Sequence, residues 1–311
     1  MVSFPVDNQT RNRFKSNPNQ FIEDVIKKFV RTSPFNRLEA FGNDLIFEAP
    51  LIGFADGNDA LFNDYKQVVH KQHFTPREIL TKYLAEKLKE ESPKIRSVNV
   101  ISFVLPINRK TKTSNAREIE GPSLRWNNTR WQGQNFITEL SRHLVFVLEQ
   151  FGVHALAPEL SPYYKIFTPP DNLASSWSQR HMAYAAGLGT FSLNDGFITP
   201  KGMAMRCGSV VTDLALSPSP RPYAHHLANC LFYATGKCGA CIRRCPGDAL
   251  SEKGHDKARC LHILFDKQKP WMDGAHGPGY IGLYAGCGLC QTGVPCENLI
   301  PVSGSQKRHN E

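Results

Sequence analysis

The residues in this sequence with the clearest chemistry are its cysteines. Nine occur in 311 residues, and eight of these lie between residues 230 and 296. The stretch 238–246, CGACIRRCP, has the spacing C-x2-C-x3-C-P, which corresponds to the last three ligands of the bacterial ferredoxin motif. In that motif the cysteine before proline binds the second cluster of a pair. The stretch therefore predicts two 4Fe-4S clusters.

A second group of cysteines completes the two-cluster pattern. Cys287 and Cys290 form another C-x2-C pair, Cys296 follows them, and Cys260 lies between the two groups. Because the ligand sets of such a pair interleave, we assign one cluster to four cysteines and the other to three. The first set is Cys245, Cys260, Cys287 and Cys290, and the second is Cys238, Cys241 and Cys296.

The second set lacks one ligand because Thr235 stands where the motif begins with cysteine. Cys230 is the favoured replacement, since iron in such clusters prefers soft thiolates. The alternatives are the Thr235 hydroxyl, one of the imidazoles of His225 and His226, or a cluster without a fourth protein ligand. A pair of zinc sites is the competing interpretation of all eight cysteines, because C-x2-C also opens zinc ribbons. Cys207, in an apolar stretch, is expected to be a buried small residue.

Helical and strand patterns alternate before the cysteines. Apolar residues at helical spacing predict an amphipathic helix over 22–30, and Thr75 with Glu78 forms a capping box for a helix that ends near residue 91. A buried strand is predicted over 97–107, a long helix over 135–151 and a short strand over 153–157. This alternation indicates a mixed α/β (α+β) core.

The proline-rich stretch 217–222 is the best candidate for a domain boundary. We therefore expect an α/β core over 1–220, a cysteine-rich domain over 221–301 and a polar tail over 302–311. The N-terminus shows no signal sequence, and no apolar run is long enough to cross a membrane. A cytoplasmic protein without membrane contact is expected, and a reducing compartment favours metal binding over disulfides.

The formal net charge of +9 favours anionic partners, although a basic soluble surface explains it equally well. The basic stretch 108–112, NRKTK, is expected to be a loop that is either solvated or in contact with phosphate.

Three segments after residue 174 resemble the superfamily of corrinoid-dependent iron-sulfur reductases, which contains the reductive dehalogenases and epoxyqueuosine reductase. They are SSWSQRHMAYAAGLGTF (175–191), DGFITP (195–200) and GSVVTDL (208–214). The similarity is strong from Trp177 to Pro301, cysteines included. It implies a nitroreductase-like core that holds cobalamin, followed by a ferredoxin-like lobe with two 4Fe-4S clusters.

The resemblance also implies a reaction and candidate residues. The clusters would reduce cobalt to Co(I) for reductive cleavage of a small organic substrate, with reduced ferredoxin, flavodoxin or a similar protein as electron donor. A helix over about 175–186 would end at a glycine turn against the cofactor, although a plain helix end explains the same glycines. The candidate cofactor-binding residues are Arg180, His181, Gly187, Leu188, Gly189 and Thr190.

Dehalogenases of this group donate a proton from tyrosine with a basic residue nearby, and epoxyqueuosine reductase uses an aspartate. The candidates here are Tyr163, Tyr164, Tyr184, Asp171 and Arg206, although each tyrosine could equally be a half-buried core residue. Two other functions remain open at this point. One is an epoxyqueuosine reductase acting on tRNA, and the other is a corrinoid-free electron-transfer protein.

Overall fold

A four-stranded antiparallel sheet lies at the centre of the computed structural model, which describes residues 6–168 and 173–301. The strand order is β3 (Leu51–Asp56), β4 (Asn99–Pro106), β10 (Met205–Thr212) and β5 (Ala155–Leu156). β4 is buried along its whole length, as predicted for the apolar stretch 97–107. Asp171 and the predicted tail 302–311 lie outside the described residues.

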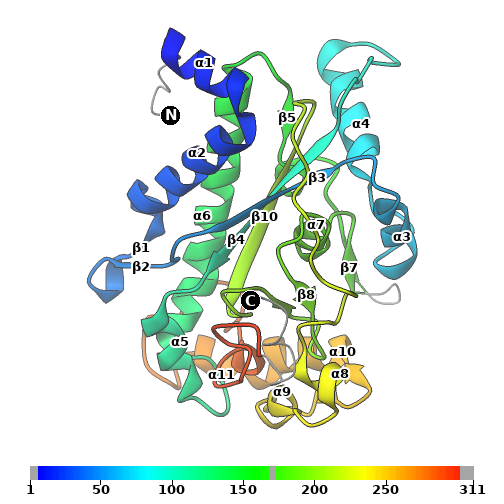
Figure 1. Ribbon diagram of the computed structural model, residues 1–311. Helices are drawn as coiled ribbons and strands as arrows, with labels where there is room; N and C mark the ends of the chain where they lie inside the picture. The colour runs from blue at the N-terminus through cyan, green and yellow to red at the C-terminus, as the bar shows by residue number, and fades with distance from the viewer. Residues whose placement is uncertain (1–5, 169–172, 302–311) are drawn as a thin grey trace, which may run out of the picture.

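The alternation of side chains along β4 divides the core into two halves. Ile101, Phe103 and Leu105 belong to one apolar cluster with α1 (Asn8–Ser16), α2 (Pro18–Thr32) and α6 (Leu124–Glu149). Since successive side chains of a strand point to opposite faces, Val100 and Val104 belong to the other cluster. That cluster contains residues of α3 (Leu61–Val68), α4 (Pro76–Leu88) and α7 (Gln179–Ala185). The molecule is therefore a mixed α/β fold with helices on both faces of the sheet (Figure 1).

Two predicted helices have the expected local chemistry. The helix predicted over 22–30 is α2, and its buried face carries the apolar residues of that pattern. In α4 both hydrogen bonds of the capping box between Thr75 and Glu78 are present. α4 ends at Leu88, three residues earlier than predicted, because Lys89 takes a left-handed conformation with φ 57°.

Two other helices differ from prediction. α6 begins at Leu124 instead of residue 135, and the Ser123 side chain accepts a hydrogen bond from the backbone N–H of Trp126 at its start. The helix predicted over 175–186 begins only at Gln179. The preceding residues form β7 (Ala174–Ser175), which pairs with β6 (Ile166–Phe167).

The C-terminal lobe, residues 221–301, consists of short elements beside α5 (Arg109–Ala116) and one end of α6 (Figure 1). Its α-helices and strands are α8 (Leu231–Thr235), α9 (Ala240–Arg243), β11 (Leu250–Ser251), β12 (Gly254–His255), α10 (Lys257–His262) and α11 (Lys269–Met272).

Two further strand pairs lie outside the lobe, namely β1 (Arg37–Leu38) with β2 (Asp44–Leu45) and β8 (Thr190–Phe191) with β9 (Phe197–Ile198).

The connector before the lobe packs along the edge of the sheet. The Ser219 backbone N–H donates to the Phe54 carbonyl at 2.8 Å, and the Phe54 N–H donates to Ser219 Oγ at 3.0 Å. Within the described residues, no helix combines the length and apolar character needed to cross a bilayer.

Candidate functional site

Four cysteines of the C-terminal lobe line a small cavity between the lobe and the core: Cys230, Cys238, Cys241 and Cys296. Burial raises the pKa of Cys241 to about 11, with further contributions from the neighbouring thiol groups of Cys230 and Cys238. The pKa of Cys296 rises to about 12, mainly through burial and then through Cys230 and Cys241. Cys230 thus joins the three cysteines that the spacing assigned to the incomplete set.

Buried polar contacts hold Cys230 at this cavity. The preceding residue, Asn229, donates from its backbone N–H to Thr190 Oγ1 at 2.9 Å and from Nδ2 to the Ile198 carbonyl at 3.0 Å. Cys230 itself is 7% exposed and is the N-cap residue that directly precedes α8. Because both anchors lie in the core, the core positions this thiol.

The other candidate replacements for the missing ligand are engaged elsewhere or exposed. The Thr235 hydroxyl donates to the Leu231 carbonyl at 2.7 Å within α8. His225 and His226 are exposed, and His225 Nδ1 accepts a hydrogen bond from the Leu227 N–H.

The other four of the eight C-terminal cysteines, Cys245, Cys260, Cys287 and Cys290, line a second and larger cavity. Burial, and after it the nearby thiols of Cys287 and Cys245, raises the pKa of Cys260 to about 11. The Ala249 backbone N–H donates to Cys245 Sγ at 3.3 Å. Hydrogen bonds of this kind to cysteine sulfur adjust the reduction potential of iron-sulfur clusters.

The N-terminal half of α6 positions the loop that carries Cys287. Asn127 Nδ2 donates to the carbonyls of Ala285 and Ile281 at 3.0 and 3.1 Å. Gly288, with φ 63°, lies against the Trp126 ring so closely that an added Cβ would overlap it. The part of α6 that the sequence did not predict is therefore the part that holds the second cysteine group.

The larger cavity has a volume of about 490 Å³, within the usual range for small-molecule sites. It lies between the α/β core and the C-terminal lobe, so the second cysteine group and core residues share it. Its lining includes Tyr284 of the lobe and several residues of the core: Trp126, Arg130, Gln134, Glu159, Tyr164, Trp177, Arg180, Arg206 and Cys207.

Asn194 and Met203 line both cavities. Asn194 Nδ2 donates to the Cys290 carbonyl at 2.9 Å, and Met203 Sδ lies 3.1 Å from Cys296 Sγ. The two cysteine groups are therefore neighbours across these two side chains.

The predicted catalytic residues are divided between the cavity and other places. Tyr164 and Arg206 line the cavity. The Tyr163 hydroxyl donates to Glu86, and Tyr184 packs against Phe191 with ring centroids 6.0 Å apart. Among the described residues, neither Tyr163 nor Tyr184 is part of the cavity lining.

The predicted cofactor-binding residues are divided in the same way. Arg180 lines the cavity, and its guanidinium donates to the Asp195 carbonyl. His181 packs against Tyr65 with centroids 4.8 Å apart, and burial lowers its pKa to about 3.

The glycine turn 187–190 contacts protein, and none of its four residues is among the described residues that line either cavity. A Cβ on Gly187 would overlap the Pro220 carbonyl oxygen, and one on Gly189 would overlap that of Ile198. Leu188 is buried in the core, and Thr190 anchors Asn229. The close approach at these glycines is therefore between chain segments, which corrects their interpretation as a cofactor wall.

The sequence did not indicate Arg130, Gln134, Glu159 or Tyr284 as cavity residues. Arg130 Nη2 donates to the Tyr284 hydroxyl at 2.6 Å, and Arg206 Nη2 donates to Gln134 Oε1 at 2.8 Å. Arg130 and Gln134 lie in the unpredicted first turns of α6, and Tyr284 lies in a loop without a motif. Cys207 also lines the cavity, and burial raises the pKa of its thiol to about 11.

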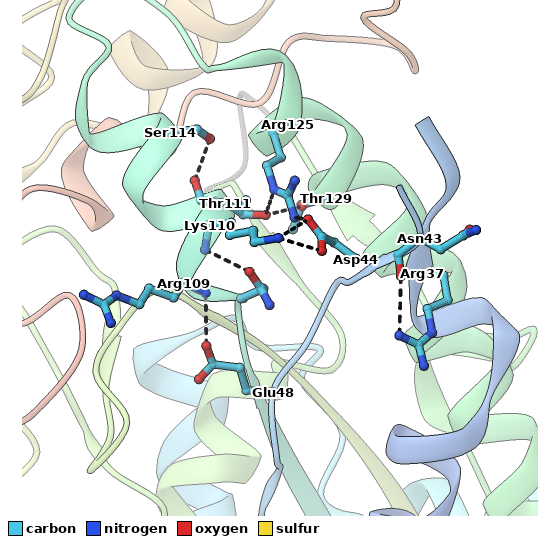
Figure 2. Close-up of polar contacts among 11 residues, drawn as sticks. Arg37, Asn43, Asp44, Glu48, Arg109, Lys110, Thr111, Ser114, Arg125 and Thr129 are labelled. Carbon is cyan, nitrogen blue, oxygen red and sulfur yellow. Dashed lines mark hydrogen bonds and ion pairs between the residues drawn. The ribbon is translucent and has the colours of Figure 1, made fainter. Parts of the chain in front are cut away.

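The basic stretch 108–112 is the start of α5 rather than a loop. Asn108 caps the helix, Lys110 Nζ lies 2.9 Å from Asp44 Oδ1, and Arg125 pairs with the same carboxylate at 2.8 Å (Figure 2). Lys112 is 4% exposed. Much of the charge of this stretch is therefore neutralised or buried.

In the described part of the chain, no three histidine, cysteine, aspartate or glutamate side chains are arranged to hold a single metal ion. The four ligands of a 4Fe-4S cluster each bind a different iron, so they surround a volume instead of converging on one point.

No family model and no curated protein matches the sequence. Among solved structures, the chain is similar to epoxyqueuosine reductase from Bacillus subtilis, with 17% identity and a TM-score of 0.46 over 90% of this chain and 66% of that one. A structure of epoxyqueuosine reductase with an epoxyqueuosine-modified tRNA-Tyr stem loop gives 17% identity and a TM-score of 0.44, also over 90% of this chain and 66% of that one. The catabolic reductive dehalogenase NpRdhA gives 17% and 0.47 over 66% of this chain and 26% of that one. The chain thus spans less than two thirds of each of these proteins.

Proposed function

We propose that this chain is an iron-sulfur reductase in which two 4Fe-4S clusters deliver electrons to a corrinoid that binds at the 490 Å³ cavity, for reductive cleavage of a small organic substrate. One observation carries the proposal. The group of Cys245, Cys260, Cys287 and Cys290 lines the same cavity as Tyr164 and Arg206, so a cluster on these thiols would face any molecule bound there.

The residues present fit these cofactors. Two groups of four thiols match the four-cysteine requirement of two 4Fe-4S clusters. The aromatic walls of the larger cavity, which include Trp126, Trp177 and Tyr164, suit a broad ring. When bound, the clusters would supply single electrons and the corrinoid a strongly reducing cobalt centre.

The chain itself would supply the proton. Cleavage of a carbon–X bond to carbon–H consumes two electrons and one proton and releases X⁻. Burial and the nearby Glu159 raise the pKa of Tyr164 above its usual value near 10, so its phenol stays protonated at neutral pH. Tyr164 is the predicted tyrosine that lines the cavity, and its hydroxyl is the proposed proton source.

A metal count tests the proposal against its rivals. After anaerobic purification and incubation with cobalamin, we expect about eight irons, about eight sulfides and about one cobalt per chain. Eight irons without cobalt would instead indicate a corrinoid-free electron-transfer protein. Tight tRNA binding with a steep salt dependence would favour an epoxyqueuosine reductase.

A further inference from the structure

Within the described part of the chain, two arginines in the larger cavity have buried N–H groups without a partner. Arg206 on β10 leaves Nε unpaired, and Arg130 on α6 leaves Nη1 unpaired. Each guanidinium is held by its other end, because Arg206 donates to Gln134 and Arg130 donates to Tyr284. A buried polar group without a partner destabilises the folded chain, and a charged group does so more strongly. Each side chain is therefore fixed by one hydrogen bond and keeps a further N–H group that is free to donate.

Without a cluster on the four thiols, the positive charge of these arginines is poorly balanced within the cavity. Among the described residues, its charged lining consists of three arginines, Arg130, Arg180 and Arg206, and one carboxylate, Glu159. Glu159 already accepts hydrogen bonds from Gln179 at 2.9 Å and from Gln134 at 3.3 Å. Burial, together with the charge of Arg130, lowers the pKa of Arg206 to about 10. An anion bound between the two arginines would reduce their electrostatic repulsion. It would also accept hydrogen bonds from their unpaired N–H groups.

We propose that Arg130 and Arg206 form an oxyanion-binding site for a carboxylate or phosphate group. The planar guanidinium group binds carboxylate and phosphate oxygens through short, charge-assisted hydrogen bonds. Two sources could supply this group, namely an acidic substrate or the phosphodiester in the nucleotide tail of a corrinoid. The substrate source rests on the proposed function, whereas the site itself rests on the cavity alone.

Binding of small probes to the full-length, cluster-loaded chain without corrinoid tests the site. Benzoate, benzamide and inorganic phosphate are titrated by isothermal calorimetry or by quenching of tryptophan fluorescence, since Trp126 and Trp177 line the cavity. We expect benzoate or phosphate to bind at least about tenfold more tightly than the neutral benzamide, the effect of one charge-assisted hydrogen bond.

Matched variants assign the binding to these residues. Arg206→Gln and Arg130→Gln should each weaken anion binding about tenfold or more, and Arg206→Lys should recover part of it. Lys110→Gln removes the same charge outside the cavity and should leave binding unchanged. Iron content and circular dichroism identify any variant that fails to fold, and Arg130→Gln then serves in place of Arg206→Gln.

Comparing cobalamin with cobinamide, which lacks the nucleotide phosphate, separates the two sources. If the phosphate is the ligand, the arginine variants weaken binding of cobalamin and leave that of cobinamide unchanged. If the substrate supplies the anion, the variants weaken binding of the anionic probes and leave that of both cobalamin and cobinamide unchanged. The proposal is overturned if benzoate, phosphate and benzamide bind equally. It is also overturned if the variants alter only the electron paramagnetic resonance of the clusters, since the arginines would then serve the cysteine groups.

Discussion

Cys230 is the residue on which the two-cluster interpretation most depends. It occupies the cavity of Cys238, Cys241 and Cys296, while the Thr235 hydroxyl is bound within α8. Cys230→Ser should therefore lower the iron content from about eight to about four per chain, because a 4Fe-4S cluster needs four cysteines.

Two variants serve as controls for this loss. Thr235→Ala and Cys207→Ser should both retain the full iron and sulfide content, since neither residue belongs to a group of four cysteines. Unchanged iron in Cys230→Ser would show that this thiol is not a ligand.

His181 makes stability depend on pH. Burial lowers its pKa in the folded chain to about 3, from about 6.5 when unfolded. The unfolded chain takes up the proton first, so this stability is complete above pH 6.5 and is lost as pH falls toward 3. Between pH 6.5 and 5 the free energy of unfolding should fall by up to about 2 kcal/mol through this residue.

Urea titrations at pH 6.5 and 5 measure this slope. His181→Gln should flatten it, whereas His262→Gln, at a side chain that is 58% exposed, should leave it unchanged. Equal slopes in the wild type and His181→Gln would contradict the assignment.

At the scale of elements, α6 links the core to the second cysteine group. Gly288 fits against Trp126 only because it lacks a Cβ, and Cys287 precedes it. Gly288→Ala should displace this loop and remove the cluster proposed for the second group, leaving about four irons per chain.

Gly274→Ala is the matched control, since Gly274 also has a positive φ, of 86°, but has no atom near its Cβ position. Both variants carry the backbone strain of a positive φ, and only Gly288→Ala carries the overlap with Trp126. Equal iron loss in the two would attribute the effect to strain instead of packing.

The same helix shows why sequence analysis reached only part of the site. The apolar periodicity predicted α6 from residue 135 onward, where Phe136, Ile137 and Leu140 pack into the core. Upstream, Asn127 and Arg130 lie on the inner face of the helix. Asn127 donates to a backbone carbonyl of the lobe, and Arg130 donates to the hydroxyl of Tyr284. Polar residues with tertiary partners leave no periodic signal, so this half of the helix and its cavity arginine were missed.

At the scale of the whole molecule, the cysteine grouping could be predicted because ligand spacing is a local property. The cavity could not, since it is formed where residues from α6, β10 and the C-terminal lobe meet. Gly187 and Gly189 illustrate the opposite error. Their sequence fits a ligand-binding turn, but Pro220 and Ile198 fill the space beside them. Long-range packing, which leaves little trace in one sequence, decides such cases.

Electron paramagnetic resonance of the corrinoid-reconstituted chain tests the central claim most directly. If the clusters deliver electrons to a bound corrinoid, we expect a protein-bound cobalt(II) signal that disappears when the clusters are reduced. In Cys287→Ser the signal should persist under the same reductant, because that variant lacks the cluster facing the cavity. No bound cobalamin and no cobalt(II) signal in the cluster-loaded chain would contradict the account.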